Sequence, residues 1–300
     1  MMQDNSKVDE LRACSESSSI EKRRSAFDMF LEGTDDFRKQ AMWILLDAPY
    51  RDVREAVIDW FSPDVLECDT WRDEVLSRVS SDCRGMSANL RQAVLIFLQR
   101  MTSVVRDDIV QFYTRAFDDD DSDVRYQAFV LAELREDSSE GYVERVGKWL
   151  DDSDRDFRIV AVQALSRLRP DWAFEKLSQK YASSSGEESF HILLALLKLC
   201  TEQARRDALA HDLSRFAMDD RFAFPAIEAA AEYGTPDEIP MLLDIAKSLL
   251  GEPTIRVAAA GAAAKLGSDV GRELLTKFSK SRHGNPMYAQ ELLAALEPQK

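Results

Sequence analysis

A short sequence pattern returns along the chain at an almost fixed interval, and this repetition constrains the fold more than any single residue. The pattern is an apolar residue, then Arg, then Ala two or three positions later. Its Arg position falls at 54, 91, 125, 158, 191, 223 and 256, so consecutive copies lie 32 to 37 residues apart. Self-similarity at this period is typical of an array of stacked repeats. Five copies keep the arginine, at Arg54, Arg91, Arg125, Arg158 and Arg256, whereas His191 and Ala223 replace it in the other two.

Each repeat is predicted to contain two helices, and residues 141–169 illustrate the pattern. Apolar residues recur at spacings of three or four between 142 and 150, which gives a first helix one apolar face. The aspartates at 151–154 can accept hydrogen bonds from the free N–H groups at the start of a second helix, and Pro170 follows its end. The sequence therefore predicts an all-α fold, an α-solenoid of about nine stacked helical hairpins in one domain over residues 1–300, with residues 1–20 as a polar N-terminal cap.

Composition agrees with a helical array. Only 11 Gly and 9 Pro occur in 300 residues, which leaves little turn material for a sheet-rich fold. The first twenty residues lack the apolar segment of a signal peptide, and no apolar run approaches the ~18 residues of a membrane span. The four cysteines are scattered and form no C-x-x-C pair, which indicates reduced thiols. A cytoplasmic protein without membrane contact is expected.

The repeated residues resemble the HEAT repeat, in the short form found in bacterial bilin-lyase-like proteins. An acidic residue precedes Val-Arg, small residues follow, and Leu266-Gly267 ends one copy. The resemblance covers roughly residues 20 to 296 and implies a HEAT-like superhelix. It also implies that a turn acid and the helix arginine bond to each other across neighbouring repeats. The pairs would be Asp119 with Arg125 and Asp152 with Arg158, with Asp47 and Arg54 as a looser match, so that the arginines form a structural ladder.

Negative charge is the second informative feature. The formal net charge is −15, and residues 101–160 hold 16 acidic against 8 basic residues, a net of −8. Equivalent turns of a solenoid stack, so two acidic turns are predicted to form one ridge that attracts a cationic partner. The alternative is that these carboxylates cap helices on a solvated edge. The ridge would comprise Asp118, Asp119, Asp120, Asp121 and Asp123 of the first turn and Asp151, Asp152, Asp154 and Asp156 of the second.

A helical wheel gives a second candidate surface. The residue two positions after the apolar residue of each pattern points away from the core side, and the resemblance places it on the concave wall. It is apolar in five consecutive repeats, a strip suited to a partner helix or an extended peptide. The alternative is that tight stacking makes this strip part of the core between repeats. The strip consists of Tyr126, Ile159, Ile192, Phe224 and Val257.

Catalytic chemistry has little support in the sequence. His191, His211 and His283 are far apart and lack metal-ligand spacing, and the acidic turns lack the loop glycine and distal Glu of a calcium-binding EF-hand. We therefore expect no catalytic residues, no metal and no cofactor. The five tryptophans are expected to be core anchors, because they fall on apolar helix faces.

The expected function is a non-enzymatic protein-interaction module that binds a helical or basic protein. A scaffold, or an inhibitor of a basic effector such as an immunity protein against a nuclease toxin, would fit. Two alternatives remain. A bilin-lyase-like subunit is suggested by the resemblance alone, and a DNA glycosylase-type HEAT enzyme is disfavoured because no face collects the basic residues that nucleic acid requires.

Overall fold

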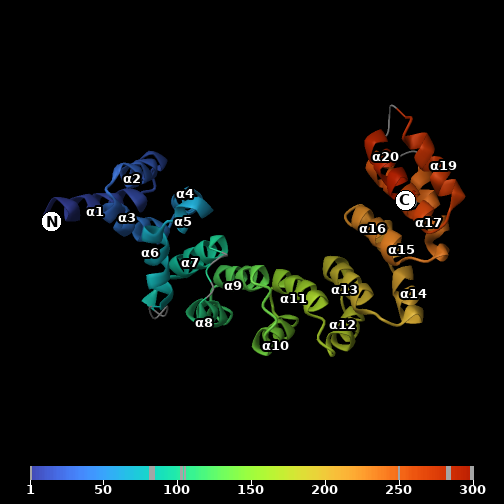
Figure 1. Ribbon diagram of the computed structural model, residues 1–300, viewed down its shortest axis with the longest axis horizontal. Coiled ribbons are helices and arrows are strands. Elements are labelled where there is room, and N and C mark those ends of the chain that lie inside the picture. Colours follow the sequence, from blue (N-terminus) through green and yellow to red (C-terminus); the bar gives the residue numbers. More distant parts are fainter. Residues whose placement is uncertain are drawn as a thin grey trace. The chain divides into compact units, whose positions relative to one another are not determined.

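The computed structural model describes residues 2–80, 85–101, 104, 106–248, 251–281 and 285–297. Within these residues the chain is helical with no strand, and the helices pack in neighbouring pairs (Figure 1). The predicted class, an all-α solenoid, is therefore confirmed. The chain divides into two compact units, Met1–Tyr142 and Val143–Lys300. The expectation of one uninterrupted domain over residues 1–300 stays a prediction.

The first unit holds the N-terminal helices. Residues 1–20, predicted as a polar cap, include a helix whose Leu11 is buried. The helices are α1 (Met2–Ser15), α2 (Ile20–Glu32), α3 (Asp35–Leu46), α4 (Arg51–Trp60), α5 (Pro63–Glu67), α6 (Asp69–Ser80), α7 (Ala88–Arg100), α8 (Asp107–Ala116) and α9 (Ser122–Leu134), and α10 (Glu140–Trp149) begins here.

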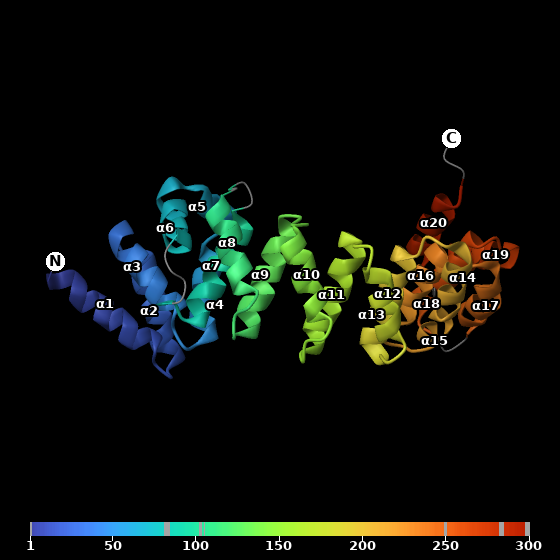
Figure 2. The ribbon, with the colours of Figure 1, turned by 90° about the horizontal axis from the view of Figure 1, so that it is seen from below.

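The second unit continues the same alternation. Its helices are α11 (Arg155–Leu168), α12 (Ala173–Tyr181), α13 (Gly186–Leu199), α14 (Gln203–His211), α15 (Leu213–Ala217), α16 (Ala223–Tyr233), a short 3₁₀ helix (Pro236–Glu238), α17 (Ile239–Lys247), α18 (Pro253–Lys265), α19 (Asp269–Phe278) and α20 (Pro286–Ala295). Helix α18 packs against α16, α17, α19 and α20, among which it lies in Figure 2.

The helix boundaries follow from local chemistry. The Asp154 carboxylate accepts a hydrogen bond from the Asp156 backbone N–H and opens α11, and Asp121 does the same for α9. Helix α11 is followed by Arg169, whose backbone is left-handed, directly before Pro170. Two residues after the end of α18 stands Gly267, where φ is +102°, and the Ser268 N–H donates to the Ala263 carbonyl. These aspartates therefore cap helices, as one of the two interpretations of the acidic turns predicted.

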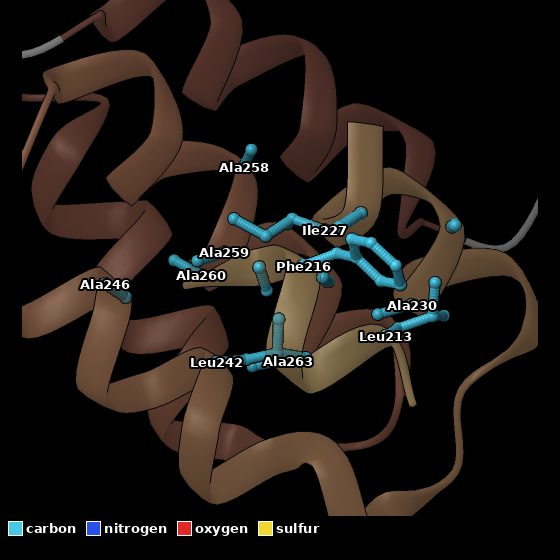
Figure 3. Packing of buried hydrophobic residues seen from close by; sticks show 14 of the residues in the cluster. Leu213, Phe216, Ile227, Ala230, Leu242, Ala246, Ala258, Ala259, Ala260 and Ala263 are labelled. Carbon is cyan, nitrogen blue, oxygen red and sulfur yellow. The ribbon is translucent and has the colours of Figure 1, made fainter. Parts of the chain in front are cut away.

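Small residues on α18 let its neighbours approach closely. The residues from Val257 to Ala264 are all buried, and most of them are alanine. Figure 3 shows methyl groups of α18, including those of Ala259 and Ala263, gathered with the larger side chains of Ile227 and Leu242. Because the alanine side chain is small, neighbouring helices can pack close to the backbone of α18 on every side. The helix is therefore enclosed by its neighbours and does not expose one polar face.

Two of the five ladder arginines, and also Arg23 of α2, bind carboxylates of the following repeat. The Arg91 Nε atom lies 2.6 Å from the carboxylate of Asp119, 28 residues further on. Arg158 donates from Nε and Nη2 to Glu188, 30 residues further on, at 2.9–3.0 Å. Arg23 of α2 contacts the carboxylate of Asp52, 29 residues further on, in the same way. Each arginine therefore clamps a carboxylate at the start of the next repeat.

Within each turn, the structure shows the arginine bound to a backbone carbonyl, and the expected side-chain pairing with the turn acid stays a prediction. Arg125 donates to the backbone carbonyl of Asp119, and Arg158 donates to that of Asp152, at 2.8 and 2.9 Å. Arg54 donates to the Ala48 carbonyl rather than to Asp47. Arg125 and Arg158 lie in the first turn of their helices, so each guanidinium reaches back to the carbonyls of the preceding loop. The other edge of the Arg158 guanidinium faces Glu188 of the next repeat.

A second group of arginines binds carbonyl groups where other helices end. Because the last four carbonyls of a helix lack partners within the helix, a guanidinium is a good substitute. Arg100 donates to the carbonyls of Ile58 and Phe61 after α4, and Arg135 donates to those of Met101 and Val104 after α7. The same arrangement recurs at Arg38, Arg169 and Arg206.

Asp119 offers a test of the clamp. Replacing Asp119 by Asn removes the charge that faces Arg91 in a site where both side chains are mostly buried, with 20% and 10% exposed. We expect Asp119→Asn to lower the free energy of unfolding by about 2 kcal/mol, measured by urea denaturation. Asp120→Asn, one exposed residue away, is the matched control and should change it by less than about 0.5 kcal/mol. Equal effects of the two variants would contradict the clamp.

The clamp also predicts a pH dependence. Burial raises the pKa of Asp119, but hydrogen bonds from Arg91 and from the Asp121 N–H outweigh it and hold the pKa below its usual value. A depressed folded-state pKa means that the contribution is complete above the unfolded value of about 3.9 and is lost as pH falls further. The difference in unfolding free energy between the native chain and Asp119→Asn should stay constant from pH 7 to about 5 and shrink below about 4. A difference that vanishes by pH 6 would refute this assignment.

Candidate functional site

The predicted apolar strip is not an exposed surface in the second unit. Ile192 and Val257 are 0% and 1% exposed, and Ile159 is 9% exposed. Phe224 is partly buried against the core of the unit, with its ring 6.4 Å from that of Tyr288. The alternative interpretation, that these residues belong to the core between repeats, therefore holds for them. The reason is that each inner helix packs on its neighbours on both sides, which covers positions that a single helical wheel places outside.

Tyr126 of the first unit behaves differently. Its side chain is 44% exposed, and its ring lies 6.5 Å from that of Phe129 on the same helix. Four and eight residues further along α9 follow the partly buried Val130 and the 54% exposed Leu134. The strip is thus reduced, among the residues predicted for it, to one exposed aromatic ring.

The acidic turn of the first unit uses its aspartates in two ways. Asp119 and Asp121 are structural, because Asp119 binds Arg91 and Asp121 caps α9. Asp118, Asp120 and Asp123 are exposed. Three of the five carboxylates predicted for this part of the ridge therefore face solvent.

The acidic turn of the second unit is partly neutralised by cations of its own. Lys180 and Lys176 approach the Asp151 carboxylate at 3.1 and 3.8 Å, and Arg155 approaches that of Asp156 at 3.6 Å. Asp154 caps α11, and Asp152 binds the Asp154 N–H. In the second turn, the acids predicted as one uniform row therefore have lysine and arginine side chains close to two of their carboxylates.

The ladder positions also differ along the chain. Arg54, Arg91, Arg125 and Arg158 bind backbone carbonyls of the preceding turn. Arg256 instead reaches the Ala246 carbonyl at 3.3 Å, and its guanidinium lies over the Phe278 ring. His191, which replaces a ladder arginine, is half-buried, and burial lowers the pKa of its imidazole.

One tryptophan departs from the sequence expectation. Trp71 and Trp149 are buried, as expected for core anchors, but Trp172 is 40% exposed beside α12. Its ring lies against Gly147, where an added Cβ would come within 2.7 Å of the ring. Among the cysteines, Cys68 is exposed and Cys200 is buried, while Cys83 lies outside the described residues.

A trough that the sequence analysis did not identify lies on the second unit. It has a volume of about 340 Å³ and is lined by α16, α18 and α20. Its floor consists of small residues of α18, among them Ala258, Gly261 and Ala262. The alanine-rich run at 257–264 is the sequence feature that could have predicted this trough. Its small side chains leave unfilled volume between larger neighbours.

Charged groups rim this trough. Glu228 is exposed and lines it, and Tyr288 lines it from α20. Burial raises the pKa of the Tyr288 phenol, and the negative charges of Glu228 and Glu291 raise it further. Two carboxylates therefore lie near enough to act on the phenol that lines the trough. Lys265 lines the trough from the last turn of α18.

Among the described residues, no three His, Cys, Asp or Glu side chains gather closely enough to hold a metal ion. None of the helices in the described ranges is both long and apolar enough to cross a bilayer.

The buried strip gives a testable prediction. Ile192→Asp places a charge in a fully buried position of α13, so it should lower the free energy of unfolding by more than about 3 kcal/mol. Tyr126→Asp, at the exposed equivalent position of α9, should change it by less than about 1 kcal/mol. Urea denaturation followed by circular dichroism measures both. If Ile192→Asp were as stable as Tyr126→Asp, the strip would be a surface after all.

Comparison with known proteins identifies no relative: no protein-family model matches the chain, and no curated protein is significantly similar to it.

Proposed function

We propose that the chain is a non-enzymatic binding module, a HEAT-type solenoid that holds a basic protein partner in the cytoplasm. One observation carries this proposal: the fold turns many of its arginines toward backbone carbonyls while leaving turn carboxylates exposed. Among the described residues, the arginines that donate to carbonyls are Arg23, Arg38, Arg54, Arg91, Arg100, Arg125, Arg135, Arg158, Arg169, Arg206 and Arg256.

This use of arginine affects the charge of the protein surface. With a formal net charge of −15, the chain is already acidic, and most of the arginines that bind carbonyls are at least partly buried. Exposed carboxylates such as those of Asp118, Asp120 and Asp123 then dominate the surface of their turn. A surface of this kind increases the association rate of a cationic protein and repels an anionic one.

The same observation disfavours nucleic acid as the ligand. Phosphate binding requires Lys and Arg side chains that can leave their present partners and release counterions. Arginines held by buried carbonyls cannot do so without exposing unsatisfied backbone groups. A scaffold for a basic protein, or an inhibitor of a basic effector, is the role that fits best.

The exposed acidic turn gives the test. The full chain is immobilised and exposed to native lysate at low and at raised salt, and captured proteins are identified by mass spectrometry. We expect basic proteins, released by salt, and at least a fivefold loss of capture when Asp118, Asp120 and Asp123 are all changed to Asn. The matched control changes the exposed Asp9, Asp28 and Glu32 to their amides and alters net charge equally.

Capture of mainly acidic proteins would contradict the proposal. Equal losses in the two triple variants would show that the turn has no special role and that only total charge matters.

A further inference from the structure

The trough of the second unit is a shaped site rather than a gap between helices. The walls come from Ile227, Glu228 and Ala231 of α16 and from Tyr288, Leu292, Ala295 and Leu296 of α20. Ile227 and the floor residues Ala258 and Ala262 are 1%, 4% and 2% exposed, so a backbone lies just beneath them. The floor is rigid, because α18 is enclosed by four helices.

Two contacts bring the wall helix α20 close to its neighbours. The rings of Phe224 and Tyr288 lie 6.4 Å apart, so α20 meets α16 at Tyr288, which lines the trough. At Gly261 an added Cβ would come within 2.7 Å of the Leu292 Cδ1 atom, so α20 also lies close against the middle of α18. Lys265 and Ala295, which also line the trough, are exposed.

Charge is distributed unevenly along the trough. Glu228 and Glu291 act on Tyr288, and Lys265, one turn after Gly261 along α18, also lines the trough. Glu228, Glu232 and Glu291 are all exposed on the two wall helices. A second copy of this chain is disfavoured as the occupant, because it would bring another acidic surface against these carboxylates.

We propose that this trough binds an amphipathic, basic helix of a protein partner, which rests an apolar side chain on Ala258 and Ala262, beside Leu292, and places a Lys or Arg beside Glu228 and Glu291. The volume of about 340 Å³ accommodates one or two large apolar side chains, which is the usual way in which a helix anchors in a groove. This inference rests on the proposed function, because it takes the partner to be a basic protein. It adds that the bound part of that protein is a helix.

The probe is a synthetic 18-residue peptide with Leu on one helical face and Lys on the other, labelled with fluorescein. Binding to the full chain is measured by fluorescence anisotropy, and the bound region is located by hydrogen exchange. We expect increased protection in α16, α18 and α20. A peptide with the same Leu face and Glu in place of Lys should bind at least tenfold more weakly.

Two variants test the floor and the rim separately. Ala262→Met fills the trough and should weaken binding of the Leu/Lys peptide at least tenfold, whereas Ala204→Met, on the exposed start of α14, should not. Glu228→Lys with Glu291→Lys should weaken binding at least tenfold at low salt. The control Glu273→Lys with Glu297→Lys alters net charge equally at exposed positions outside the trough lining. The rim variant keeps the test decisive if Ala262→Met fails to fold.

The outcomes separate this inference from the proposed function. Protection at residues 118–123 without protection of α18 would overturn the trough and leave the acidic module standing. Equal binding of the Leu/Glu peptide, or no effect of the rim variant, would also overturn the trough. Failure to capture any basic protein from lysate would remove the proposed function itself.

Discussion

The arginine clamp between consecutive repeats is the interaction on which the rest of the structure depends. A guanidinium has a planar fork of donors, so it can serve a backbone carbonyl with one edge and a carboxylate with another. Arg158 does this with Asp152 behind it and Glu188 ahead of it, and the hydrogen bond to Glu188 raises the pKa of the guanidinium. A solenoid lacks contacts between distant parts of the chain, so its cohesion comes from neighbouring interfaces of this kind.

This use of arginine shapes the surface as well as the interior. A guanidinium that binds carbonyls between helices is less accessible to solvent. The acidic residues that cap helices, in contrast, lie in the turns at the surface of the array. In both acidic turns carboxylates stay exposed, and in the second turn Lys176 and Lys180 lie close to that of Asp151. The trough has a local cause as well. The small alanines of α18 let neighbouring helices approach but leave volume between α16 and α20.

Much of the fold could be predicted from the sequence because helices depend on local patterns. The apolar spacing at 142–168 and the aspartates before α9 and α11 predicted helices and caps that the structure has. The partners of the arginines could not be predicted from spacing within one turn, because the carboxylate comes from the next repeat, 28 to 30 residues away. The sequence also left open whether Ile192 and Val257 are buried, as the structure shows them to be. A helical wheel describes one helix and not the neighbours on either side.

A double-mutant cycle on Arg158 and Glu188 tests the central claim most directly. The free energy of unfolding is measured for the native chain, Arg158→Gln, Glu188→Gln and the double variant, and the coupling energy is obtained from the four values. Both side chains are mostly buried, with 22% and 13% exposed, so the clamp predicts a favourable coupling of about 1 to 3 kcal/mol. A coupling near zero would mean that the repeats cohere without the guanidinium clamp and would contradict this account.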